Sequence, residues 1–327
     1  MSRITAPLAD LYSSIRSDLQ EVERVFDKEL VSDYRFVDDL CDRVRAYRGK
    51  MLRPALLLLA GKTCGRVSSN HHTLAAVIEM VHVATLVHDD VLDEADERRG
   101  QAPINSVEGN VAAVLLGDYL ISHAYHLCSS LEDQAAARMI GSTTNAVCEG
   151  ELLQNRHRGD AGLSESTYFE IIERKTGALT ATACELGALY AGADAEGVAS
   201  LRSFGLAVGV AFQIVDDLLD IRGDRQEVGK SLGLDFSDGK LTLPTIHCLA
   251  NAGPETAAAL RSAVLGETTT GRDRLRRWLT ETDSLGYASS VALEYIGRAR
   301  SALEIFPPSD ARSSLTAMAE FIIQRRQ

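Results

Sequence analysis

No proline occurs between Pro103 and Pro244, although the sequence contains seven in all. Proline ends or kinks a helix because it lacks an amide hydrogen and its ring collides with the preceding turn, so this interval can hold long unbroken helices. Apolar residues recur there every three or four positions, which is the period of a helix face. One such face comprises Leu201, Phe204, Val208 and Phe212. The spacing therefore predicts an all-α chain.

The same period marks five segments that we expect to be helices, at 74–93, 111–130, 135–155, 166–191 and 201–220. Glycine, proline and charged residues gather between them, and these clusters predict loops at 61–70, 98–106, 156–163 and 222–239. No low-complexity stretch and no repeat of solenoid period divides the sequence. We therefore expect one large helical domain over residues 1–327.

The acidic composition bears on the partners of the protein. The net charge of −12 and the pI near 5.2 argue against a nucleic-acid partner, which would require a basic face. The longest uninterrupted apolar run, 55–61, is too short to span a bilayer, and the N-terminus lacks the apolar core of a signal peptide. We expect a cytoplasmic protein with no integral membrane segment.

Three carboxylates lie together at Asp89, Asp90 and Asp93. Positions four apart share one face of a helix, so Asp89 and Asp93 would lie side by side, with Asp90 on the flank. Like charges repel, and a cation between them would remove that repulsion. Hard oxygen ligands at this density suit Mg²⁺, which also bridges to phosphate groups. The alternative for a single cluster of this kind is a solvated acidic helix end.

A second cluster, Asp216, Asp217 and Asp220, repeats that spacing at the end of another apolar helix. Two such clusters are far less expected as surface decoration than one. If the two helices face each other, the carboxylates would form a metal-lined opening above an apolar cavity. The pair of clusters therefore predicts a metal-dependent diphosphate site.

Basic residues near these clusters could supply the rest of a phosphate site. Lys50 and Arg53 flank Pro54 at an expected helix start, where free amide groups also favour anions. The other candidates follow or lie between the acidic clusters and are Arg98, Arg99, Lys175, Lys230 and Lys240. Each alone is a common surface charge, and their significance comes from the set.

Six blocks of the sequence resemble the trans-type isoprenyl diphosphate synthases, particularly the medium- and long-chain polyprenyl members. The blocks are GKMLRP (49–54), VHVATLVHDDVLDEADERRG (81–100), EGELLQ (149–154), KTGAL (175–179), FQIVDDLLDIRGD (212–224) and GKSLGLDFSDGKLTLP (229–244). They follow the order of the family and cover residues 45 to 250. The resemblance implies the isoprenoid synthase fold, a single helical bundle around a central apolar cavity, and a Mg²⁺-dependent prenyltransferase that forms a homodimer. The helix at 111–128 is the candidate interface.

The resemblance also implies a role for each matched residue. Asp89 and Asp93 would bind Mg²⁺ on the allylic diphosphate with help from Asp90, and Asp216 would bind the remaining Mg²⁺ with indirect support from Asp217 and Asp220. The implied contacts to the allylic diphosphate are Arg98, Lys175, Thr176, Gln213, Lys230 and Lys240. The implied contacts to isopentenyl diphosphate are Gly49, Lys50, Arg53, His82 and Arg99. The implied catalytic set is Asp89, Asp90, Asp93, Lys175, Asp216 and Asp217.

Product length would depend on the residues just before the first cluster, which in this family form the floor of the elongation cavity. The family's short-chain members often carry aromatic residues there, whereas this sequence has Ala84 and Thr85. A helical turn advances about 5.4 Å, close to the length of one isoprene unit. We therefore expect a product longer than C20, in the range C30 to C50. Deeper candidates for the floor are Ile78, Val81, Tyr119 and Met139.

Three other functions fit part of the pattern. A class I terpene cyclase also ionises diphosphates with aspartate-rich helices, but it does not need cations such as Lys50 and Arg53 for isopentenyl diphosphate. A non-catalytic subunit of a heteromeric synthase would usually have lost aspartates, and both clusters are intact here. A helical di-iron protein could use Glu79-x-x-His82, but that fold needs a second copy, which the sequence lacks.

Overall fold

The computed structural model describes residues 8–47, 49–95, 97–98, 101–222, 234–268 and 270–324. Within these ranges the secondary structure is helical, and the one β-type pairing is an isolated bridge between Arg98 and Gln101. The all-α prediction is therefore confirmed. Two residues assigned to diphosphate binding, Arg99 and Lys230, lie outside the described residues.

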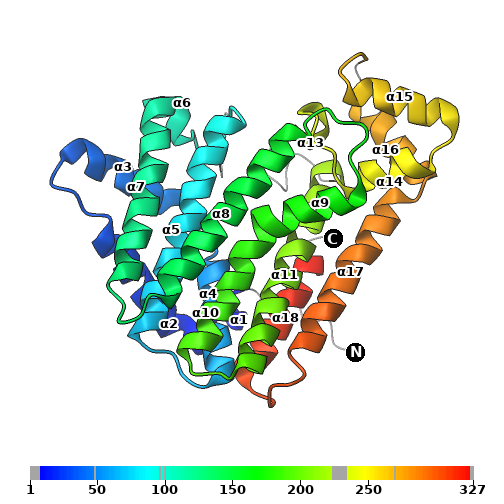
Figure 1. Ribbon diagram of the computed structural model, residues 1–327. Helices are drawn as coiled ribbons and strands as arrows, with labels where there is room; N and C mark the ends of the chain where they lie inside the picture. The colour runs from blue at the N-terminus through cyan, green and yellow to red at the C-terminus, as the bar shows by residue number, and fades with distance from the viewer. Residues whose placement is uncertain are drawn as a thin grey trace. The chain divides into compact units, whose positions relative to one another are not determined.

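The helices of the N-terminal half differ widely in length (Figure 1). They are α1 (Leu8–Leu11), η1 (Ser13–Ile15), α2 (Arg16–Glu29), α3 (Arg35–Tyr47), α4 (Leu52–Cys64), α5 (Ser69–Leu92), α6 (Ile104–Glu108), α7 (Asn110–Ser129) and α8 (Ala135–Arg156). The remaining elements are α9 (Glu165–Ile172), the π-helix η2 (Glu173–Gly177), α10 (Ala178–Tyr190), α11 (Ala195–Arg222), α13 (Leu234–Ser237), α14 (Leu243–Asn251), α15 (Pro254–Val264), α16 (Arg272–Glu281), α17 (Ser284–Ala302) and α18 (Asp310–Gln324).

The chain gathers into two compact units, and each takes three separate stretches of sequence. The first unit comprises 1–144, 179–205 and 302–318, and the second comprises 145–178, 206–301 and 319–327. Because neither unit is continuous in sequence, a shift in composition along the chain could not mark where one unit ends and the other begins. The assignment of residues 1–327 to a single domain remains a prediction.

The core of the first unit forms around α5, which packs against α2, α4 and α7 (Figure 1). The apolar run Leu56–Ala60 of α4 is fully buried there. Helix α10 approaches α4 so closely that a Cβ on Gly187 would lie 2.2 Å from the carbonyl oxygen of Leu57. The Gly187 carbonyl oxygen is 3.1 Å from Nε2 of buried His71 on α5. Glycine at this position therefore lets three helices meet.

The second unit has its own apolar cluster, formed by α14, α15 and α16 together with the end of α11. Its buried members are Ile221, Cys248, Leu260, Leu275, Trp278 and Leu279. Helix α14 also contacts α9, which leads into the π-helix η2. This packing supports the part of the second unit that carries the second aspartate cluster.

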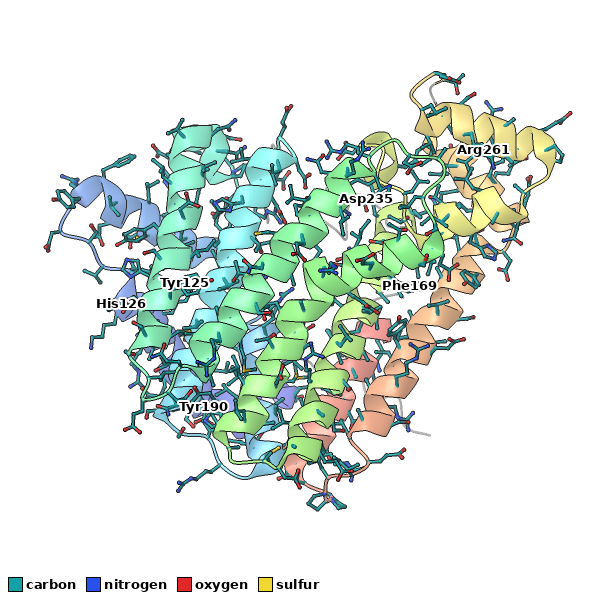
Figure 2. The ribbon with its side chains drawn as sticks, viewed as in Figure 1. Tyr125, His126, Phe169, Tyr190, Asp235 and Arg261 are labelled. Atoms are coloured by element: carbon teal, nitrogen blue, oxygen red, sulfur yellow. The ribbon has the colours of Figure 1, made fainter. Side chains whose placement is uncertain are left out.

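Two helices among the described residues are long and apolar enough to cross a membrane, α7 and Ala195–Ile221 of α11. The longest uninterrupted apolar run, 55–61, lies in neither of them, because glycine, serine and single charges break up their apolar residues. The core helices of soluble proteins share these properties, and 56% of an apolar 18-residue stretch of α11 is buried inside the protein, against 33% of such a stretch of α7. Tyr125 and His126 lie on the exposed side of α7 (Figure 2).

Candidate active site

The first aspartate cluster lies where α5 ends. The Asp93 amide donates to the carbonyl oxygen of Asp89 at 2.8 Å and closes the last turn. The three side chains differ in burial, because Asp93 is exposed, Asp89 is partly buried and Asp90 is only 1% exposed. Asp89 and Asp93 are therefore accessible to a ligand, whereas Asp90 is turned into the protein.

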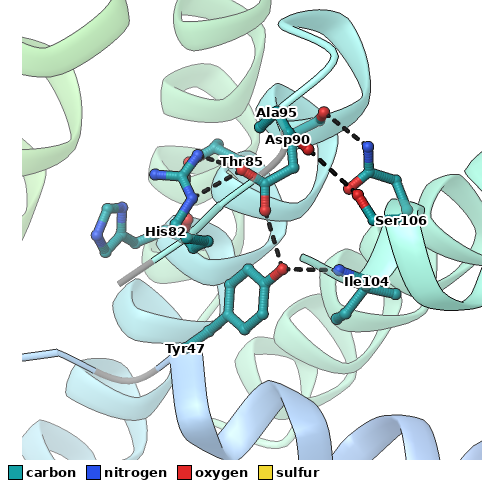
Figure 3. A network of polar contacts seen from close by, with 9 residues as sticks. Tyr47, His82, Thr85, Asp90, Ala95, Ile104 and Ser106 are labelled. Carbon is teal, nitrogen blue, oxygen red and sulfur yellow. Dashed lines mark hydrogen bonds and ion pairs between the residues drawn. The ribbon is translucent and has the colours of Figure 1, made fainter. Parts of the chain in front are cut away.

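Protein donors surround the buried carboxylate of Asp90 (Figure 3). Its Oδ2 accepts a hydrogen bond from the Tyr47 hydroxyl at 2.9 Å, and its Oδ1 accepts one from Nε of Arg98 at 2.7 Å. The Tyr47 oxygen in turn accepts the amide of Ile104 at 3.0 Å. Asn105 donates to the Asp90 backbone carbonyl at 3.0 Å. This network fixes Arg98 next to the first cluster, as the sequence predicted, whereas the part played by Tyr47 was not foreseen.

The basic motif at 49–54 lies at the start of α4 in the same unit. Met51 adopts a left-handed conformation with φ of 51°, and its carbonyl accepts the amide of Ala55 at 2.9 Å. The Lys50 carbonyl accepts the Tyr12 hydroxyl at 2.9 Å, so the N-terminal segment holds this turn. Lys50 is exposed and Arg53 partly buried, and both flank the helix N-terminus as predicted. Sequence reasoning missed Tyr12, because its partner is a backbone atom far along the chain.

In the second cluster the middle aspartate is again the buried one. Asp217 is 4% exposed, whereas Asp216 and Asp220 are partly buried. The Tyr168 hydroxyl donates to Asp217 Oδ2 at 2.6 Å, and Nε2 of Gln213 donates to Oδ1 at 2.9 Å. The structure thus joins Gln213 to the second cluster.

Negative charge is crowded around this cluster. Burial raises the pKa of Asp217 to about 8, and the charges of Asp235 and Asp216 add to the effect. Burial and the charge of Asp220 raise the pKa of Asp235 to about 6, although Lys240 and Lys175 act in the opposite direction. Asp235 lies on α13 (Figure 2), and its amide donates to Asp220 Oδ2 at 3.3 Å. Sequence reasoning overlooked Asp235, although it lies within the matched block at 229–244.

These carboxylates fit a hard divalent cation. Like charges that raise one another's pKa are stabilised when a cation neutralises them. Across the residues that the structure describes, no group of three or more histidine, cysteine, aspartate or glutamate side chains forms a preassembled metal cage. Mg²⁺ does not require one, because it is commonly held by one or two carboxylates together with substrate phosphates and water.

Lys175 and Thr176 lie in the π-helix η2, a wide turn that often marks a functional site. Lys175 Nζ donates to Gln154 Oε1 at 2.8 Å and pairs with Glu151, both on α8. The Thr176 hydroxyl donates to Gln213 Oε1 at 2.8 Å. The matched block at 149–154 therefore holds Lys175, the lysine predicted to contact the diphosphate, in place. The sequence of the block did not indicate this role.

Gly150 sets the distance between α8 and this turn. A Cβ on Gly150 would lie 2.6 Å from the Lys175 amide nitrogen. We expect Gly150→Ala to lower kcat/KM for the allylic substrate about tenfold to hundredfold, because a shift of about 1 Å in a substrate-positioning group can cost that much. Steady-state kinetics would measure this.

The matched control is Gly141→Ala on the same helix, where an added Cβ meets only the side chain of Tyr125, 3.4 Å from its hydroxyl oxygen. That variant should keep its activity and gain up to about 1 kcal/mol of stability, since alanine is favoured over glycine in helices. Equal activity of both variants would refute the role given to Gly150.

The residues assigned to product length lie on α5 ahead of the first cluster. Ala84 is fully buried, and the Thr85 hydroxyl donates to the carbonyl oxygen of His82 at 2.7 Å. The deeper candidates Ile78 and Val81 are also buried. Ala84 therefore lies in the interior of the first unit, and its influence on product length remains a prediction.

Comparison with known proteins places these features in a family. The family model described as "Polyprenyl synthetase" matches residues 35–281, well over half of the chain. The octaprenyl diphosphate synthase of Escherichia coli K12 is 34% identical over 311 residues, covering 94% of this chain and 96% of that protein. The all-trans-nonaprenyl-diphosphate synthase (geranyl-diphosphate specific) of Rhodobacter capsulatus is 34% identical, covering 97% of this chain and 98% of that protein.

A solved structure agrees with these sequence matches. The polyprenyl synthase of Caulobacter crescentus CB15, complexed with calcium and isoprenyl diphosphate, superposes with a TM-score of 0.92 at 33% identity and full coverage of both chains. The all-helical fold with two aspartate clusters is that of a prenyltransferase. This chain belongs to the polyprenyl synthetase family.

Proposed function

We propose that this prenyltransferase condenses an allylic diphosphate with isopentenyl diphosphate, in the presence of Mg²⁺, to make a polyprenyl diphosphate longer than C20. The observation that carries the proposal is the arrangement within each aspartate cluster. In each cluster the middle carboxylate is buried and accepts a hydrogen bond from a side chain predicted to contact the diphosphate. That side chain is Arg98 in the first cluster and Gln213 in the second. Membership of the family and the octaprenyl and nonaprenyl names of the relatives support both the reaction and the product class.

The two diphosphates would use different residues. For the allylic diphosphate we propose Arg98, Lys175, Thr176, Gln213, Lys230 and Lys240, with Asp89, Asp93 and Asp216 as the Mg²⁺ ligands. For isopentenyl diphosphate we propose Gly49, Lys50, Arg53, His82 and Arg99. Lys50 and Arg53 at the start of α4 support this assignment, because a helix N-terminus adds free amide groups and a favourable dipole for an anion.

The chemistry begins when the allylic carbon–oxygen bond breaks and its electron pair leaves with the diphosphate. Arg98 and Lys175 would hold that diphosphate, and bound Mg²⁺ would stabilise its added charge. The double bond of isopentenyl diphosphate then attacks the allylic carbon. The attack leaves a cation on the isopentenyl unit, which then loses a proton to the released diphosphate and forms a new double bond, so no additional general base is required. Apolar surroundings would keep water from the carbocation.

Product analysis by mass spectrometry tests the proposal directly. The purified protein is incubated with Mg²⁺, labelled isopentenyl diphosphate and a C10, C15 or C20 allylic primer. We expect label in polyprenyl diphosphates of C30 to C50, and no product when EDTA removes the metal. Cyclised hydrocarbon without label would instead identify a terpene cyclase. No turnover by the protein alone would favour a subunit of a heteromeric synthase.

We propose further that the enzyme acts as a cytoplasmic homodimer through α7. Helix α7 carries a row of exposed apolar side chains, and such rows mark interaction surfaces. Val111 is 76% exposed and Leu115 is 62% exposed, in a helix of high apolar content. This row supports the interface predicted at 111–128.

A further inference from the structure

A tyrosine hydroxyl binds the middle carboxylate of each aspartate cluster. Tyr47, at the end of α3, donates to Asp90 from 43 residues earlier in the chain. Tyr168, on α9, donates to Asp217 from 49 residues earlier. Both tyrosines are buried, with 7% and 3% exposure. The same contact thus arises twice, from helices that differ in sequence and position.

The second oxygen of each carboxylate also has a matching role. Asp90 accepts a hydrogen bond from Tyr47 on Oδ2 and one from Arg98 on Oδ1. Asp217 accepts a hydrogen bond from Tyr168 on Oδ2 and one from Gln213 on Oδ1. Arg98 and Gln213 are both among the proposed ligands of the allylic diphosphate. In each cluster a chain of two hydrogen bonds therefore runs from a tyrosine, through the middle carboxylate, to a diphosphate-binding side chain.

We propose that Tyr47 and Tyr168 are positioning residues that fix the middle carboxylate of each cluster, so that this carboxylate aims Arg98 or Gln213 at the diphosphate. Metal binding then falls to Asp89, Asp93 and Asp216. The inference rests on the proposed function, since it assigns these residues within the same diphosphate site.

A tyrosine hydroxyl suits this task better than a basic side chain. It is a neutral donor, so it orients the carboxylate without cancelling the negative charge that attracts the metal. Its ring is rigid and buried, so the donor keeps one direction. A bound divalent cation would favour the ionised form of Asp217, and hydrogen bonds to an ionised acceptor are about twice as strong as neutral ones. Removal of the hydroxyl should release the carboxylate, and with it the diphosphate-binding side chain.

The test compares Tyr47→Phe and Tyr168→Phe with Tyr190→Phe and Tyr287→Phe. The control hydroxyls also donate to carboxylates, at 3.0 Å to Asp133 and 2.7 Å to Glu165, one in each unit. All four variants lose one hydroxyl bound to a carboxylate, and only the first two alter an aspartate cluster. Circular dichroism and thermal melting would show that each variant is folded.

Binding is measured without turnover, as the affinity for inorganic pyrophosphate in the presence of Mn²⁺, by electron paramagnetic resonance of the metal. We expect this affinity to fall about tenfold in Tyr47→Phe and Tyr168→Phe, the usual scale for a lost hydrogen bond to a charged group, and to stay within about twofold in the controls. The KM for the allylic diphosphate should rise by a similar factor, with a smaller change in kcat.

A double variant shows whether each tyrosine acts through its aspartate. Tyr47→Phe should cause no further loss of pyrophosphate affinity in a protein that already carries Asp90→Asn, because the effects of substitutions within one hydrogen-bonded chain are not additive. Tyr168→Phe and Asp217→Asn should behave likewise. If a phenylalanine variant does not fold, the asparagine variant alone is measured, since it weakens the same bond.

Two kinds of failure are distinguishable. A wild-type protein that does not condense isopentenyl diphosphate would overturn the proposed function. A wild-type protein that is active, with Tyr47→Phe and Tyr168→Phe matching their controls in pyrophosphate affinity and KM, would overturn the positioning role alone.

Discussion

Asparagine in place of Asp89 or Asp216 is expected to lower kcat/KM about a thousandfold, the scale on which loss of one charge-stabilising group acts in a transition state. Each substitution keeps the shape of the side chain but removes the negative charge that would bind a divalent cation. Both side chains are partly buried at the ends of apolar helices, so the fold should survive the change. Higher Mg²⁺ concentration should recover part of the lost rate.

Exposed acidic residues on neighbouring helices provide the comparison. Glu23→Gln changes an exposed side chain on α2, which packs against α5, and Glu196→Gln changes an exposed residue at the start of α11. Both should retain wild-type rates and Mg²⁺ dependence, measured by incorporation of labelled isopentenyl diphosphate. If Asp89→Asn and Asp216→Asn were as active as these two, neither aspartate could be a metal ligand.

The long helices were predictable because their own sequences determine them. The intervals expected at 111–130 and 135–155 agree with α7 and α8 to within one residue at either end. The loop expected at 61–70 is shorter than predicted, because α4 continues to Cys64 and α5 begins at Ser69. A reciprocal cap explains that early start, since the Ser68 amide donates to Nδ1 of His71 at 3.1 Å.

The direction in which each aspartate points was harder to predict. Helical spacing gives the angle between Asp89 and Asp90, but the face that meets the interior depends on which helices pack around it. Tyr47 and Tyr168 come from such helices, and nothing in the local sequence links them to the clusters. The same limit applies to the π-helix η2, where a continuous helix at 166–191 was expected. Its wide turn lies in close contact with Gly150 of α8, which the sequence of the turn does not encode.

Site residues in local contact with the clusters were easier to predict than those that reach the clusters from other helices. Arg98 and Gln213 lie 8 and 4 residues from the aspartates that they bind, so both contacts are local in sequence, although the resemblance rather than this proximity pointed to Gln213. Asp235 was missed because its effect is electrostatic and comes from another helix. The assignments of Arg99 and Lys230 fall outside the described residues and remain predictions.

Phenylalanine at position 84 is expected to shorten the product to C20 or less. Ala84 is fully buried on α5, five residues before Asp89, which is about 7.5 Å along the helix axis. If this position faces the growing chain, an aromatic ring there would stop elongation after one or two isoprene units. Mass spectrometry of products made with a C10 primer would give the length distribution.

A second substitution on the same helix face turns this test into a measure of distance. Val77 is also fully buried and lies seven residues before Ala84, so Val77→Phe would place the ring about 10.5 Å farther from Asp89. Its product should exceed that of Ala84→Phe by about two isoprene units, because one turn of about 5.4 Å matches one unit. Both variants overpack the core and should lose a similar stability, about 1–3 kcal/mol. Unchanged product length in Ala84→Phe, in a protein that is folded and active, would mean that this face of α5 does not line the elongation cavity.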